Sequence, residues 1–219
     1  MKDAQGNLVL GRTRWRRFAA VLVPAVAAAS LLVVGIANGA IPASFAVSGS
    51  TFKVSADELD GTGFVQYGGF AQEKGGRMLP GTNIPDPTDA KNHAVAVSGI
   101  SSASLTKLCQ SVVMPGTNIS LVINAGGNGT PATATDLMID LTQLNGDATF
   151  NNISIGQDAS TLNKGPAGAQ GLPGFFGQQA DSVTIKHLTQ IAWSTSAGTF
   201  VLNGLDLHVS LKKEECFPG

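Results

Sequence analysis

The chain has 219 residues, of which only 13% are charged, and its formal net charge at pH 7 is −1. Beyond residue 17 it has no basic cluster and no interleaved aromatic residues, which argues against a nucleic-acid partner. Its 27 glycines indicate many tight turns between strands.

The charge is distributed unevenly between the N-terminus and the rest of the chain. Residues 1–17 carry Lys2 and four Arg against Asp3, a side-chain sum of +4. The remainder carries nine Lys or Arg against fourteen Asp or Glu, a sum of −5. This asymmetry is the one expected of a membrane protein whose positive flank lies inside the cell and whose acidic body lies outside it.

Residues 18–37, FAAVLVPAVAAASLLVVGIA, contain no charge and follow a run with four Arg. Twenty apolar residues suffice to span a bilayer, whereas the apolar part of a cleaved signal is usually shorter. Small residues at about 39–46 also offer cleavage sites, so the segment is either a retained anchor or a removed signal. We therefore expect a cytoplasmic tail (1–17), an anchor or signal (18–37), a linker (38–43) and an extracytoplasmic domain (44–219).

Residues 44–219 show the texture of β-structure. We expect a first strand over 45–54, a turn at Asp60-Gly61 and a second strand over 64–67. Three prolines place 75–91 in a long loop. Strands are expected over 94–98 and 101–110 and near 119–123, followed by a turn cluster over 124–131.

Two later runs alternate between apolar and polar residues. The first is predicted to point Leu137, Ile139 and Leu141 inward. Asn145-Gly146 then predicts a hairpin or corner. The second run, over 205–211, is predicted to point its three Leu and Val209 inward, with His208 on the polar face. Such alternation is typical of a sheet with one solvated side.

Cys109 and Cys216 are the only cysteines. In an oxidising compartment they predict one disulfide, which would tie the C-terminal tail to the middle of the domain. Two separate thiols are the alternative.

No motif identifies a catalytic, metal or cofactor site. His93, His187 and His208 lie far apart, without further ligands at metal spacing. No serine lies in the G-x-S-x-G motif of a nucleophile elbow. The remaining candidates are four carboxylates that a glycosidase would need in pairs, Asp136, Asp140, Asp147 and Asp158. We expect no cofactor and lean towards a protein that is not an enzyme.

Glycine recurs at every third position from Gly165 to Gly177, which is the spacing of collagen. Four triplets are too few for a triple helix, so we expect a surface loop. Its apolar tip, residues 172–176, either contacts a lipid surface or partner or folds back onto the domain.

Several stretches resemble a known family. They include SFAVSGSTFKVSADELDGTGFVQYGGFAQ, LCQSVVMPG, DLTQLNGDATFNNISIGQDASTLNKGP and FGQQADSVTIKHLTQIAWSTSAGTFVLNGLDLHVS. The family consists of uncharacterised exported or membrane-anchored actinobacterial proteins, which are often labelled cholesterol esterase by automatic transfer. The resemblance implies export and transfers no site residues.

The sequence therefore predicts one all-β domain, a sandwich or flattened solenoid-like sheet pair, behind an N-terminal transmembrane or signal helix. The expected function is that of a non-enzymatic cell-envelope protein, which binds an apolar ligand such as a lipid or forms part of a surface assembly. The alternative is a lipid esterase. We expect the protein in the cell membrane, single-pass with the C-terminal domain extracellular, or secreted if the N-terminal segment is removed.

Overall fold

The computed structural model describes residues 48–218. The predicted tail, anchor or signal, and linker, residues 1–43, lie outside them. The described residues form nine strands and one short 3-10 helix, Ala159–Thr161, which confirms the all-β class. Over the same residues, no helix has the length and hydropathy needed to cross a membrane.

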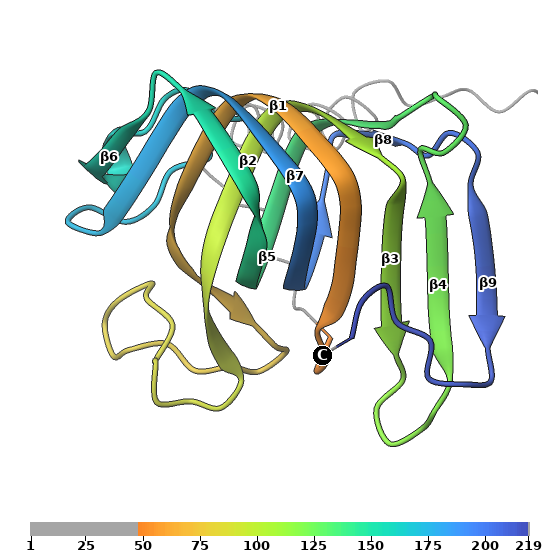
Figure 1. The fold of residues 1–219 in the computed structure, drawn as a ribbon. Helices are drawn as coiled ribbons and strands as arrows, with labels where there is room; N and C mark the ends of the chain where they lie inside the picture. Colours follow the sequence, from red (N-terminus) through yellow and green to blue (C-terminus); the bar gives the residue numbers. More distant parts are fainter. Residues whose placement is uncertain (1–47, 219) are drawn as a thin grey trace, which may run out of the picture. The chain divides into compact units, whose positions relative to one another are not determined.

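All nine strands belong to one antiparallel sheet (Figure 1). They are β1 (Phe52–Gln72), β2 (Asn92–Thr106), β3 (Leu108–Val113), β4 (Ser120–Ala125), β5 (Ala132–Asn151), β6 (Ser154–Asp158), β7 (Phe176–Ser196), β8 (Thr199–Val201) and β9 (Asp206–Ser210). Their order is β6-β7-β5-β2-β1-β3-β4-β9, and β8 pairs with β5.

Four long strands close into a ring. β1 pairs with β2, β2 with β5, β5 with β7, and β7 returns to pair with β1. Leu59 of β1, for example, lies between Leu105 of β2 and Ile185 of β7. The expected pair of sheets is thus replaced by a single sheet that closes on itself, and its pairings are antiparallel rather than those of a solenoid.

A three-stranded extension, which we call the wing, consists of β3, β4 and β9. β3 follows β2 along the edge of β1, β4 pairs with β3, and β9 pairs with β4. Lys107 separates β2 from β3 with a left-handed φ of 51°, an irregularity at which the chain leaves the ring for the wing.

The ring encloses the main hydrophobic core. Leu137, Ile139 and Leu141 are all buried there, as their alternation predicts. Many of the other inward side chains are small. Gly61 shows why: a Cβ at this position would lie 2.7 Å from Cγ2 of Ile100 on the neighbouring strand β2.

The turn predicted at Asp60-Gly61 and the hairpin predicted at Asn145-Gly146 are wrong, because glycine here serves packing and bulges rather than chain reversal. Asp60-Gly61 lies within β1, which includes residues 52–54 of the first predicted strand and all of the second. Asn145-Gly146 lies within β5, where the pairing with β7 shifts register between Asn145 and Asp147. The predicted loop over 75–91 is confirmed, because β1 ends at Gln72 and β2 begins at Asn92.

The glycine-rich segment between β6 and β7 lies against the outside of the ring. Leu162 and Ala169 are buried against Val65 of β1. Phe175 and Phe176 remain 40% and 58% exposed, so the aromatic end of this segment does not fold back into the core.

The inward orientation predicted for the last apolar run is wrong. Leu205, Leu207, Val209 and Leu211 expose 53%, 54%, 57% and 80% of their surface. Alternation correctly predicts which residues of β9 share a face. The more covered face, however, is the polar one, which bears His208 and Ser210.

The C-terminal tail, residues 211–218, covers that second face of the wing. The predicted disulfide joins Cys109 of β3 to Cys216 of the tail. The backbone N–H of Cys216 donates to Oγ of Ser111, and the N–H of Glu214 donates to Oγ of Ser120. Nζ of Lys53 in β1 contacts the tail at Oε1 of Glu215, at 3.1 Å.

Replacing Gly63 by Ala should destabilise the fold. Gly63 has a φ of 68°, and a Cβ there would lie 2.5 Å from both the backbone oxygen of Lys164 and Oγ of Ser101. We expect Gly63→Ala to lower the free energy of unfolding by about 2 kcal/mol or more in urea titrations. Gly68→Ala is the matched control, because no atom lies within 4 Å of its Cβ position. Equal stability of the two variants would contradict the packing argument.

Removing the disulfide should destabilise the domain and release the tail. The bond closes a loop with a sequence separation of 107 residues, for which loop-closure entropy gives about 4–5 kcal/mol. The double variant Cys109→Ser/Cys216→Ser should therefore unfold at a lower temperature. Its backbone amide at position 216 should also exchange hydrogen faster, because the tail is no longer tied to β3. Addition of a reductant should reproduce the shift in wild type and leave the variant unchanged.

Candidate functional site

The interior of the ring contains a small cavity. It is lined by Leu59, Phe64, Gln66, Ser98, Ile100, Ile139, Leu141, Leu144, Phe150, Ile185 and Gln190. Its free volume of about 50 Å³ is well below the roughly 300–1,000 Å³ of pockets that hold drug-sized ligands. The ring as it stands has no room for a sterol or an acyl chain.

Three polar side chains line this otherwise apolar cavity. Nε2 of Gln66 donates to Oγ of Ser98 at 2.8 Å, and Oε1 of Gln66 accepts from Nε2 of Gln178 at 2.6 Å. Gln190 is 3% exposed, and its Oε1 has no hydrogen-bond partner among the described residues.

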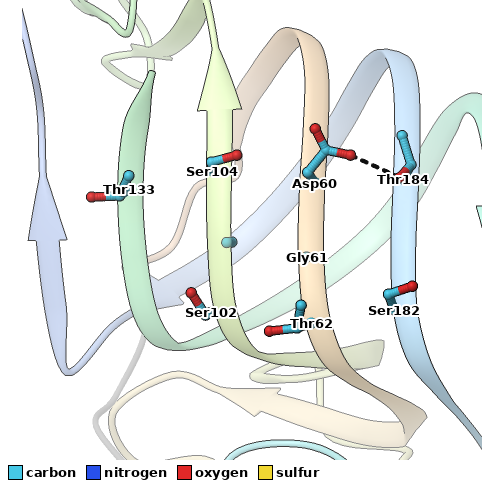
Figure 2. Close-up of a pocket in the computed structure, with 9 residues that line it drawn as sticks. Asp60, Gly61, Thr62, Ser102, Ser104, Thr133, Ser182 and Thr184 are labelled. Atoms are coloured by element: carbon cyan, nitrogen blue, oxygen red, sulfur yellow. Dashed lines mark hydrogen bonds between the residues drawn. The ribbon is translucent and has the colours of Figure 1, made fainter. Parts of the chain in front are cut away.

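A larger depression lies on the outer face of the same strands. We call it the hydroxyl trough, and its volume is about 450 Å³ (Figure 2). Its polar side chains are Asp60 and Thr62 of β1, Ser102 and Ser104 of β2, Thr133 of β5, and Ser182 and Thr184 of β7.

Strand register arranges these side chains in two rows. Asp60 lies between Ser104 and Thr184, and Ser104 pairs in turn with Thr133. In the second row, Thr62 lies between Ser102 and Ser182. Directly paired residues of antiparallel strands point to the same face with their Cβ atoms about 5 Å apart, so the rows form a regular array of hydroxyl groups.

Most of the trough hydroxyls have no hydrogen-bond partner among the described residues. Oγ1 of Thr184 donates to Oδ1 of Asp60 at 2.7 Å, and Oγ of Ser182 accepts from Asn151. The side chains of Thr62 and Ser102 make no hydrogen bond within residues 48–218, and the same holds for Ser104 and Thr133. Each hydroxyl can both donate and accept, which suits a ligand that itself carries hydroxyl groups.

A second polar cluster lies on the outer face of the ring near β5. Oγ of Ser194 donates to Oδ2 of Asp140 at 2.6 Å. Burial raises the pKa of Asp140 above its ordinary value, and the bond from Ser194 offsets part of that rise. Burial, followed by the charge of Asp140, raises the pKa of Tyr67 to about 12, so its hydroxyl stays protonated at neutral pH.

Each histidine contacts a carboxylate. His93 lies 2.9 Å from Glu73 and stacks on Trp193, and His187 lies 2.9 Å from Asp147. His208 is 3.4 Å from Glu214. No serine hydroxyl hydrogen-bonds a histidine ring nitrogen within 48–218, so the described residues contain no hydroxyl activated in the manner of a serine hydrolase.

Three of the four carboxylates noted in the sequence have separate partners, and the fourth, Asp136, lies in β5 with a left-handed φ of 49°. Asp140 binds Ser194 and Asp147 binds His187, whereas Asp158 accepts from Ser160 and from the backbone N–H of Gly174. Among residues 48–218, no group of three or more His, Cys, Asp or Glu is placed to hold a metal ion.

Sequence reasoning missed the hydroxyl trough. Its residues come from four strands and are brought together by register alone. A signal was present, because serine or threonine recurs at alternate positions 102 and 104, 133 and 135, and 182 and 184. Those positions are the solvated faces of strands, where such residues are ordinary.

Residues 48–218 thus define an all-β protein with a closed sheet, a packed interior and a polar outer trough. The chain belongs to the family of unknown function DUF6230, whose profile matches residues 48–217. No curated protein and no solved structure matches it.

The buried Asp140 carboxyl should make stability depend on pH. Because burial raises its folded pKa above the unfolded value near 3.8, the folded state binds more protons in the interval between the two values. Wild type should therefore lose stability relative to Asp140→Asn as pH rises through that interval. Above the interval, the difference in free energy of unfolding between the two proteins should stay constant. Urea unfolding between about pH 3 and pH 7 measures the effect.

Asp158 serves as a control, because its contribution to stability should depend on pH in the opposite direction. Hydrogen bonds from Gly174 and Ser160 lower its pKa, so its contribution to stability is lost as pH falls through the folded pKa. If the stabilities of Asp140→Asn and Asp158→Asn relative to wild type changed with pH in the same direction, the two assignments could not both hold.

Proposed function

We propose that this protein is a non-enzymatic component of the cell envelope that binds a hydroxyl-rich polymer, a polysaccharide, along the hydroxyl trough. The observation that carries the proposal is the double row of hydroxyl groups fixed across four strands of the closed ring. The rows are held by backbone pairing, so they are preorganised and lose little conformational freedom when a ligand binds.

Two features support an extracytoplasmic address. The Cys109–Cys216 disulfide is of the kind that persists in oxidising compartments. The uncharged residues 18–37 follow a basic run, and the charge sums of +4 and −5 on either side have the sign expected for export. We propose that residues 18–37 attach the protein to the membrane, or are removed from a secreted form.

The chemistry of the trough favours a neutral polyol over other ligands. Asp60 is its only charged group, so it offers no cationic site for a phosphate or carboxylate. A carboxylate can accept hydrogen bonds from two hydroxyls at once, and the surrounding Ser and Thr can match donors and acceptors on a sugar. The trough has no aromatic side chain for stacking, so each repeat of the polymer should bind weakly and affinity should increase with chain length.

The two earlier hypotheses find less support in the geometry. Carriage of a lipid inside the domain would need a cavity several times larger than the roughly 50 Å³ in the ring. An esterase would need a serine hydroxyl within hydrogen-bond reach of a histidine, and the described residues contain no such bond. The outer face of the ring is therefore the site on which we base the proposal.

Polysaccharide binding can be tested with the full-length chain in mild detergent and beads bearing dextran, mannan or galactan. Wild type should be retained by at least one polymer. The double variant Thr62→Val/Ser104→Ala should bind about tenfold more weakly, since it removes two hydrogen-bonding hydroxyls. Asp60→Asn should also weaken binding, because an amide is a poorer acceptor than a carboxylate.

Ser154→Ala on β6 is the matched control, because it removes an exposed strand hydroxyl outside the trough. Its retention should equal that of wild type. Equal retention of Thr62→Val/Ser104→Ala and wild type, or no retention of wild type by any of the polymers, would overturn the proposal.

A further inference from the structure

The apolar side chains of β9 form an exposed row at one end of the sheet. Leu205, Leu207, Val209 and Leu211 are each more than half exposed. Leu207 and Val209 lie beside Ile123 and Leu121 of β4, which extend the same apolar face inward. Monomeric soluble proteins rarely expose a contiguous row of this kind without a binding partner.

The outer edge of β9 is also unpaired. Within residues 48–218, β9 pairs with β4 alone and is the terminal strand of the sheet (Figure 1). Every second residue of such a strand directs its backbone N–H and C=O outward, so an edge is a template for another strand.

The edge of β9 lacks two of the devices that block such pairing. β9 contains no proline, and its five consecutive pairs with β4 show no bulge. β6, at the opposite end of the sheet, is protected: its pairing shifts register between Ile155 and Gln157, and Gly156 has a φ of 85°. One end of the sheet is thus closed to further pairing and the other is open.

We propose that two copies of this chain associate through β9, with the two strands antiparallel and His208 at the two-fold axis. In this register Leu207 of each copy lies opposite Val209 of the other, and Leu205 lies opposite Leu211. Residues 205, 207, 209 and 211 are placed symmetrically about residue 208. The four apolar side chains of both copies therefore lie on the same face of the joined sheet. A two-fold contact of this kind needs only the one patch, because each copy offers the same edge and the same apolar row to the other, and this favours a second copy over an unrelated partner.

The exposed area fits a dimer that forms at high local concentration. The four side chains expose on the order of 400 Å² per copy, and edge pairing covers only their flanks, so the contact is well below the roughly 800 Å² that each partner gives to a standard interface. The paired backbones supply part of the remainder. We therefore expect a concentration-dependent dimer rather than a permanent one.

A lipid surface is a poorer occupant of this edge. Inserting the row into hydrocarbon would also bury the unpaired N–H and C=O groups of β9, each at a cost of several kcal/mol. A second strand satisfies those groups and packs against the flanks of the same side chains.

Cysteine cross-linking tests both the contact and its register in the full-length chain in mild detergent. His208→Cys should give a covalent dimer under mild oxidation, because the two Cα atoms face each other within disulfide range. Asp206→Cys alone and Ser210→Cys alone should give roughly tenfold less, since like positions lie about four residues apart along the pair. A mixture of Asp206→Cys and Ser210→Cys should restore the cross-link.

The contribution of the apolar row is tested by adding a charge in the His208→Cys background. Val209→Lys should abolish the covalent dimer, because two lysines would face the partner's Leu207 across the axis. Ile155→Lys is the matched control, because Ile155 is 66% exposed on β6 and its substitution should leave the cross-link unchanged. Absence of a His208→Cys dimer overturns the proposal, and so does equal cross-linking of all three single cysteine variants. Either result would leave the outer edge of β9 to residues preceding 48 or to a different partner.

Discussion

The pairing of β1 with β7 is the constraint on which the rest of the structure depends. It joins the first and the seventh strand, so that the backbone edges of both are satisfied within one ring. A ring of only four long strands has a narrow interior, because the width of a closed sheet grows with the number of its strands. Alanine and glycine are therefore needed where strands face each other closely, as at Ala180 and Gly61, and the cavity that remains is about 50 Å³.

This narrow interior directs the functional argument to the outside of the protein. The same register that packs Leu59 inward places Asp60 and Thr62 outward, next to the hydroxyls of β2 and β7. The rigidity of the trough is thus a direct consequence of ring closure. The wing lies outside the ring, and no other strand of residues 48–218 covers its apolar face, which is why β9 differs in exposure from every strand of the ring.

Alternation predicted the β class and the buried face of Leu137, Ile139 and Leu141 because these residues belong to a strand with one covered side. The same pattern failed at Leu207 and Val209. A period of two distinguishes the two faces of a strand, but only tertiary packing decides which face is covered. The turn expected at Asp60-Gly61 failed because the missing Cβ makes room for Ile100 of the neighbouring strand β2. The trough could not be predicted from the sequence, because its two rows depend on long-range strand register. The disulfide could be predicted, because the sequence contains only two cysteines.

Ring closure also has a consequence for the time course of folding. Phe52 pairs with Ala192, which lies 140 residues further along the chain, so β1 gains the neighbour on its second edge late in synthesis. Such non-local pairings fold slowly, because the entropy of closing a long loop is lost before the contacts form. Until then β1 exposes one long edge while β2 already covers the other, and the Cys109–Cys216 bond cannot yet constrain the chain. The interval between synthesis of β1 and closure of the ring is then the period in which the protein is most exposed to aggregation and proteolysis.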